Sequence, residues 1–171
     1  MITRVLALVV FFSLTSAAHA FTTVAWGAAG TTCVPDRATV SKFEAVNPAT
    51  LRHVGAQVGA LVFTCNVERF DTPNQSWSLR ISYRDSTGMG TTASVVARLY
   101  RVSLTGAAPS LIGTASSDTF GATGNTTQFE AFNHTFTFET HAYFVQLTLT
   151  RAVSTEIVRL SSVSIEVGSP D

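Results

Sequence analysis

The stretch WSLRISYR, residues 77–84, decides the fold class. Large apolar side chains occupy its odd positions, and serine or arginine occupies its even positions. A period of two places the apolar side chains on one face of an extended chain and the polar ones on the other. The stretch therefore predicts a β-strand with one face in a hydrophobic core and the other in solvent.

Similar apolar patterns and turn residues recur along the chain, and no window shows a helical stripe. Further strands are expected near 38–46, 53–58, 61–67, 92–104, 111–112, 132–138, 142–151 and 157–167, with a loop over 116–127. Turns about every ten positions are typical of a sandwich. We predict an all-β fold: a single antiparallel β-sandwich of about 8–10 strands, jelly-roll-like or Ig-like, with one disulfide.

Keeping apolar side chains together suggests two hairpins. In the first, strand 77–84 pairs with the strand that follows loop 85–91, so that Ile81 lies opposite Val95. In the second, a tight turn near residues 140–141 places Phe136 opposite Val145.

Residues 1–20 have the pattern of a secretory signal peptide. Arg4 precedes an apolar run over 5–14, and Ala18-His19-Ala20 matches a cleavage site. We expect one domain over 21–171, exported to the periplasm or the extracellular space, with no later transmembrane segment. An uncleaved N-terminal anchor is the alternative.

Cys33 and Cys65 are the two cysteines of the chain. An even pair in an exported protein predicts a disulfide, which would stabilise the fold by about 3.5–4 kcal/mol in the chain-entropy model. Free thiols or a metal site are the alternatives. The metal site is disfavoured because two thiolates without nearby histidine or cysteine do not complete a zinc shell.

The composition excludes some classes of protein. The 171 residues are 46% hydrophobic and 13% charged, with eleven basic and eleven acidic residues. Disorder and nucleic-acid binding driven by net positive charge are therefore disfavoured. The charges are unevenly placed: segment 69–101 holds five arginines against two acids, whereas 102–150 holds no basic residue. Such asymmetry predicts an electrostatically two-sided molecule.

Arginine and aromatic side chains are the candidate binding groups. Planar guanidinium groups bind carboxylates and sulfates in a bidentate manner, and exposed rings pack against sugar faces. An acidic glycan or an anionic cell-surface polymer is the ligand class that this pattern favours; a solubilising outer sheet face is the alternative. The candidate binding residues are Trp26, Arg80, Arg84, Arg98 and Tyr100.

No sequence template for catalysis is present: a nucleophile elbow, H-E-x-x-H, a P-loop and G-x-G-x-x-G are all missing. His134 is interpreted either as a pocket base or as a histidine at the core edge with a backbone partner. Glu139 and His141 belong either to a metal site or to a solvated turn. We predict a non-enzyme without cofactor or metal; calcium at loops 85–91 or 118–125 is the alternative.

Several motifs resemble a loose group of uncharacterised exported bacterial proteins. They are CVPD at 33–36, ISYRD at 81–85 with the following STGMG, ARLY at 97–100 and YFVQLTLTR at 143–151. The resemblance implies a bacterial exported β-sandwich and supplies no activity.

Together these patterns favour a non-catalytic exported binding module for a polar or glycan-type ligand. A structural or surface-assembly protein that binds another protein is the first alternative, and a small secreted hydrolase is the second.

Overall fold

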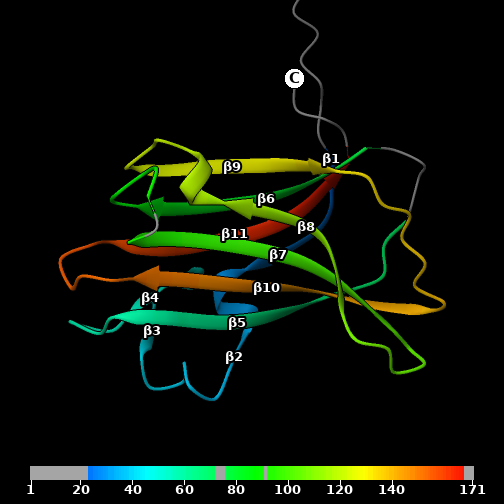
Figure 1. Ribbon diagram of the computed structural model, residues 1–171, viewed down its shortest axis with the longest axis horizontal. Coiled ribbons are helices and arrows are strands. Elements are labelled where there is room, and N and C mark those ends of the chain that lie inside the picture. The colour runs from blue at the N-terminus through cyan, green and yellow to red at the C-terminus, as the bar shows by residue number, and fades with distance from the viewer. Residues whose placement is uncertain (1–22, 72–75, 91, 168–171) are drawn as a thin grey trace, which may run out of the picture.

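Two antiparallel β-sheets pack face to face in the computed structural model, which describes residues 23–71, 76–90 and 92–167 (Figure 1). This confirms the predicted all-β sandwich. Those residues contain no α-helix, and so no helix that could cross a membrane. The predicted signal peptide, residues 1–20, lies outside the described residues.

The first sheet, here called the β11 sheet, is built around a long central strand. β1 and β4 pair with one edge of β11, one after the other, and β6 pairs with its opposite edge. Its strands are β1 (Thr23–Ala29) and, in the order of pairing, β3 (Phe43–Val46), β4 (Thr50–His53), β11 (Val158–Val167), β6 (Trp77–Asp85) and β9 (Asn125–Phe132).

The second sheet, here called the β10 sheet, has a simpler order. In Figure 1 its strands β5, β10 and β7 run side by side across the picture. The order of pairing is β2 (Val34–Pro35), β5 (Gly59–Val67), β10 (His141–Arg151), β7 (Ala93–Ser103) and β8 (Ser110–Ser116). Short 3-10 turns occupy Gly30–Thr32 and Ser117–Thr119.

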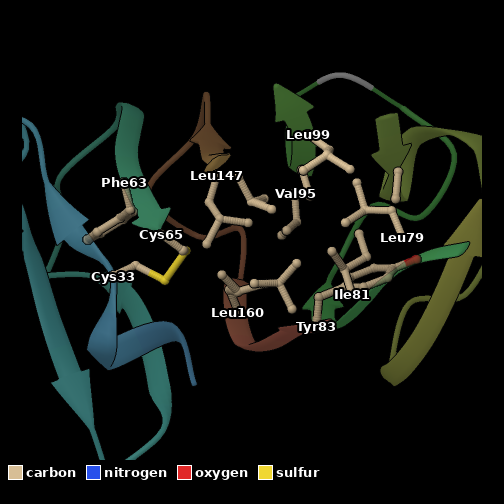
Figure 2. Close-up of a cluster of buried hydrophobic side chains, with 14 of the residues drawn as sticks. Cys33, Phe63, Cys65, Leu79, Ile81, Tyr83, Val95, Leu99, Leu147 and Leu160 are labelled. Carbon is tan, nitrogen blue, oxygen red and sulfur yellow. A yellow bond between two sulfur atoms is a disulfide. The ribbon is translucent and has the colours of Figure 1, made fainter. Parts of the chain in front are cut away.

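The core lies between the sheets and contains the predicted disulfide. Cys33 and Cys65 are bonded and buried beside Phe63 (Figure 2). The odd positions of 77–83, identified from sequence, are all at most 3% exposed, which confirms the inner face of that strand.

The first predicted hairpin is wrong in its pairing. Ile81 pairs with Val163 in the β11 sheet, whereas Val95 pairs with Leu149 in the β10 sheet. Both side chains point into the core, from opposite sheets (Figure 2). Period-two alternation identifies which side chains are buried. It does not show whether two strands pair within one sheet or face each other across the sandwich, because the same side chains are buried in both arrangements. The chain therefore passes from one sheet to the other between β6 and β7 instead of forming a hairpin.

The second predicted hairpin is also wrong. Strand β9 ends at Phe132, and the following residues leave the sheet. Phe136 packs against Trp77 and Tyr143, with ring centroids 5.0 and 4.9 Å apart, and so covers part of the core. Val145 pairs with Cys65 and Leu99 instead. The alternating phenylalanines reflect packing by an irregular segment, not a strand.

Other boundaries also differ from the prediction; the strand expected at 111–112, for example, extends over 110–116. The strand expected at 38–46 shortens to 43–46, and the strand expected at 53–58 lies instead at 50–53, because a turn at Asn47 joins the two into a short hairpin. Asn47 adopts φ +64°, and its side chain accepts hydrogen bonds from the amides of Ala49 and Thr50. The expected loop at 116–127 is shorter, since β9 already begins at Asn125.

Candidate functional site

The five residues predicted to bind do not form one surface. Arg80 and Arg84 lie on the outer face of the β11 sheet, on strand β6. Arg98 and Tyr100 lie on the outer face of the β10 sheet, on strand β7. Trp26 lies in the core. The expected surface is therefore split between opposite faces of the sandwich.

Tyr100 has an aromatic neighbour that the sequence analysis missed. Phe144, on strand β10, is its direct cross-strand partner. The two rings are stacked, with centroids 5.2 Å apart and planes inclined by 17°, and both are partly exposed. The signal was available: Phe144 follows Tyr143, and the alternation that buries Tyr143 must turn Phe144 outward.

Polar side chains and one leucine lie next to this aromatic pair. Asn66 lies opposite Phe144 on β5, and Leu111 lies opposite Tyr100 on β8. The adjacent outward-facing row is polar across four strands: Thr64, Gln146, Arg98 and Thr114. We call these eight residues the aromatic platform: Thr64, Asn66, Arg98, Tyr100, Leu111, Thr114, Phe144 and Gln146.

The platform combines two kinds of contact. The stacked rings offer apolar faces and edges, while a guanidinium group and two amides offer hydrogen-bond donors and acceptors. All of them stand on strands of one sheet, so their relative positions are set by backbone pairing, which shifts register between Leu99 and Tyr100 where β7 meets β8. Such a surface suits an extended ligand with alternating apolar and hydroxyl-rich edges.

On the opposite sheet, Arg80 is already engaged. Its guanidinium donates to the Glu166 carboxylate at 2.9 Å, and Glu166 is 3% exposed. Ser164 donates a second hydrogen bond to the same carboxylate oxygen. Arg80 thus serves mainly to neutralise a buried acid. Arg84, further along β6, faces Arg159 across the strand pair.

Trp26 does not provide the exposed ring that the sequence analysis expected. It retains 9% exposure and packs in the core, where it pairs with Ile165 of β11. The pairing of β1 with β11 is irregular between Val24 and Trp26, and this irregularity turns the indole inward.

The histidine and acidic candidates form local contacts. His134 Nε2 lies 3.3 Å from the Tyr143 hydroxyl, a side-chain partner and not the expected backbone one. Burial lowers the pKa of His134, and Arg101 and His141 lower it further. Glu139 forms an exposed ion pair with Arg69 at 2.7 Å, and His141 Nδ1 lies 2.8 Å from the Thr140 hydroxyl.

One of the two loops considered for calcium begins at a hydrogen-bonded aspartate. The Asp85 carboxylate is fully buried and accepts hydrogen bonds from Thr87 and Ser117. Burial raises the pKa of Asp118, and burial together with Asp85 and Asp118 raises the pKa of Tyr83 to about 12. Within the described residues, no group of three or more histidine, cysteine or acidic side chains is arranged to hold a metal ion.

No family model and no curated protein matches this chain. Solved structures do resemble it. They include a xylan-binding module, CBM15 (12% identity, 75% of this chain and 84% of that one, TM-score 0.43). The CBM36-1 domain of a multidomain xylanase from the hindgut metagenome of Trinervitermes trinervoides also matches (10% identity, 88% and 99% coverage, TM-score 0.37). A third is the carbohydrate-binding module CBM29_1 from Piromyces equi (9% identity, 87% and 91% coverage, TM-score 0.34). These chains are similar in their sandwich architecture, and no binding residue is carried over from them.

Proposed function

We propose that this protein is a non-catalytic module that binds a polysaccharide chain across the aromatic platform of the β10 sheet. The observation that carries the proposal is the partly exposed stack of Tyr100 on Phe144, set beside a row of polar side chains. In the free protein the pair also supports the sheet, as cross-strand aromatic pairs do.

Sugar rings suit both parts of the platform. The C–H faces of a pyranose are apolar and pack against aromatic rings, whereas its hydroxyl groups both donate and accept hydrogen bonds. Arg98 and Gln146 are direct cross-strand neighbours in the row next to the rings, so one sugar can contact a ring and a polar group together. Successive residues of a chain then follow the exposed face of the sheet.

The proposal is tested by screening the purified protein on a glycan array of β-linked xylo-, gluco- and manno-oligosaccharides, with and without a calcium chelator. The best ligand is then titrated by calorimetry against Tyr100→Ala, Phe144→Ala and Arg98→Ala. We expect each aromatic replacement to weaken binding about 10-fold or more, the effect of about 1.4 kcal/mol.

Phe129→Ala is the matched control. Phe129 is 44% exposed and lies on β9, on the outer face of the opposite sheet. Its removal should leave the affinity unchanged. Equal affinities for wild type and Tyr100→Ala/Phe144→Ala, or an array with no bound glycan, would overturn the proposal.

A further inference from the structure

Three arginines lie directly opposite one another on the outer face of the β11 sheet. Arg159 on β11 pairs with Arg52 on β4 and with Arg84 on β6. Glu44 on β3 and Asn125 on β9 complete this row at its two ends. Residues far apart in the sequence thus form a continuous line of guanidinium groups across three neighbouring strands.

Such a row is unfavourable without counter-charges. Arginine stays ionised, and like charges directly opposite on a sheet destabilise it. One member of the row is compensated, because Arg52 forms an ion pair with Glu44 at 2.6 Å. Within the part of the chain that the structure describes, the buried Nε atoms of Arg84 and Arg159 have no hydrogen-bond partner. Buried donors of this kind normally have one.

A hollow of about 460 Å³ lies beside these two arginines. We call it the arginine hollow. Hydroxyl groups line it in two neighbouring pairs: Thr50 with Ser161 at 3.4 Å, and Ser82 with Thr127 at 3.1 Å. Asparagine amides also line it, at Asn47 and Asn125.

The charge of the arginine hollow is one-sided. None of the described residues that line it is acidic, and two of them, Arg84 and Arg159, are positively charged. A second hollow, of about 300 Å³, is also lined by Arg159, together with Arg52, Arg151 and the acids Glu44 and Glu156. Acids therefore offset part of the positive charge in the second hollow, whereas none of the described residues lining the arginine hollow does so.

We propose that the arginine hollow binds a carboxylate or sulfate group of an acidic polysaccharide. Two adjacent guanidinium groups present planar donors that match an oxyanion in a bidentate manner. The surrounding hydroxyl and amide groups match the sugar hydroxyls that flank such an anion. The site lies on the opposite sheet from Tyr100 and Phe144 and shares no residue with the aromatic platform, so the two proposals succeed or fail separately.

The first test uses inorganic sulfate as the probe. Thermal unfolding is followed in sulfate and in chloride at equal ionic strength, because salt alone screens the repulsion among the arginines. We expect sulfate at about 100-fold its Kd to raise the Tm by about 5–10 °C. Arg159→Gln and Arg84→Gln should lose this shift. Without anion, Arg159→Gln should unfold at the same temperature as wild type or higher, since it removes the central like charge.

Arg37→Gln is the matched control, because it makes the same change of net charge at an exposed position in a turn. It should keep the sulfate-dependent shift. Equal shifts in wild type and Arg159→Gln would overturn the site.

A second titration tests whether the anion belongs to a polysaccharide and whether it is a carboxylate or a sulfate. Its ligands are tri-galacturonate, a sulfated heparin tetrasaccharide and a neutral oligosaccharide of the same length. We expect at least one acidic oligosaccharide to bind about 10-fold or more tightly than the neutral one, and Arg84→Gln to abolish the difference. Binding of sulfate without preference for either acidic oligosaccharide would overturn the assignment to a polysaccharide.

Discussion

The Asp85 carboxylate accepts a 2.7 Å hydrogen bond from the Ser117 hydroxyl, and this contact joins the two sheets at one end of the sandwich. Asp85 ends β6 in the β11 sheet. The Ser117 oxygen in turn accepts from the amide of Val95, which belongs to β7 in the β10 sheet. Asp85 also accepts two bonds from Thr87, at 2.9 Å each. The loop that follows β6 is therefore held by a fully buried carboxylate.

Asp85→Ala is expected to lower the free energy of unfolding by about 2–4 kcal/mol, because it leaves the buried Ser117 hydroxyl and the part-buried Thr87 amide without their acceptor. Urea denaturation measures the change. Asp71→Ala, at an exposed position, should stay within about 0.5 kcal/mol of wild type. A loss below about 1 kcal/mol for Asp85→Ala would show that the buried carboxylate contributes little net stability.

Gly88, in the same loop, lies close to the loop that follows β8. It adopts φ +63°, and an added Cβ would lie 2.9 Å from the Gly121 carbonyl oxygen. Gly106 also has positive φ, +92°, but a Cβ there would meet nothing within 4 Å. Alanine costs about 1–2 kcal/mol of backbone strain at either position. Gly88→Ala adds a backbone clash.

We therefore expect Gly88→Ala to destabilise the protein by at least about 1 kcal/mol more than Gly106→Ala, as measured by urea denaturation of both variants. Both variants carry the cost of alanine at a positive φ. The difference between their free energies of unfolding therefore measures the clash between the two loops. Equal losses would mean that the loops move apart at no cost.

Substitutions at Trp26 test whether this aromatic side chain supports the core or binds ligand. Trp26→Ala should lower the free energy of unfolding by about 3–5 kcal/mol, because the indole is a core side chain. Trp26→Phe keeps most of the packing, and it should bind the glycan found by array with wild-type affinity. Calorimetry with this variant checks the second expectation; a 10-fold weaker affinity would place Trp26 in the binding site.

The sequence predicted which face of a strand is buried better than it predicted which strands pair. Alternation at 77–84 identified which side chains are buried, because the period of a strand is local. It did not identify the partner strand, since Ile81 pairs with Val163 within its own sheet and lies in the same core as Val95 of the other sheet. The same limit applies to the sites. Arg84 was found as an outward arginine, but its neighbours Arg52 and Arg159 come from distant strands that only the sheet order brings together.

His53 makes stability depend on pH below neutrality. It is 2% exposed, and its Nε2 donates to the Gly59 carbonyl oxygen at 2.9 Å. Within the described residues its buried Nδ1 has no partner. Burial lowers the pKa of His53 below 6.5, and the nearby Arg151 guanidinium lowers it further, although the bond to Gly59 opposes this. Protonation would thus place a second, unpartnered N–H beside a cation.

Because the folded-state pKa lies below the unfolded value, the unfolded chain binds more protons between the two. The contribution of His53 to stability is therefore complete above pH 6.5 and is lost as the pH falls from 6.5 through the folded-state pKa. His134, whose pKa is also lowered, adds a decline of the same sign.

His53→Gln, which can keep the bond to Gly59, should flatten the pH dependence of the free energy of unfolding, measured in urea between pH about 7.5 and about 5. His134→Gln should flatten it separately, and the double variant most. Parallel pH curves for wild type and the double variant would assign the decline to other groups.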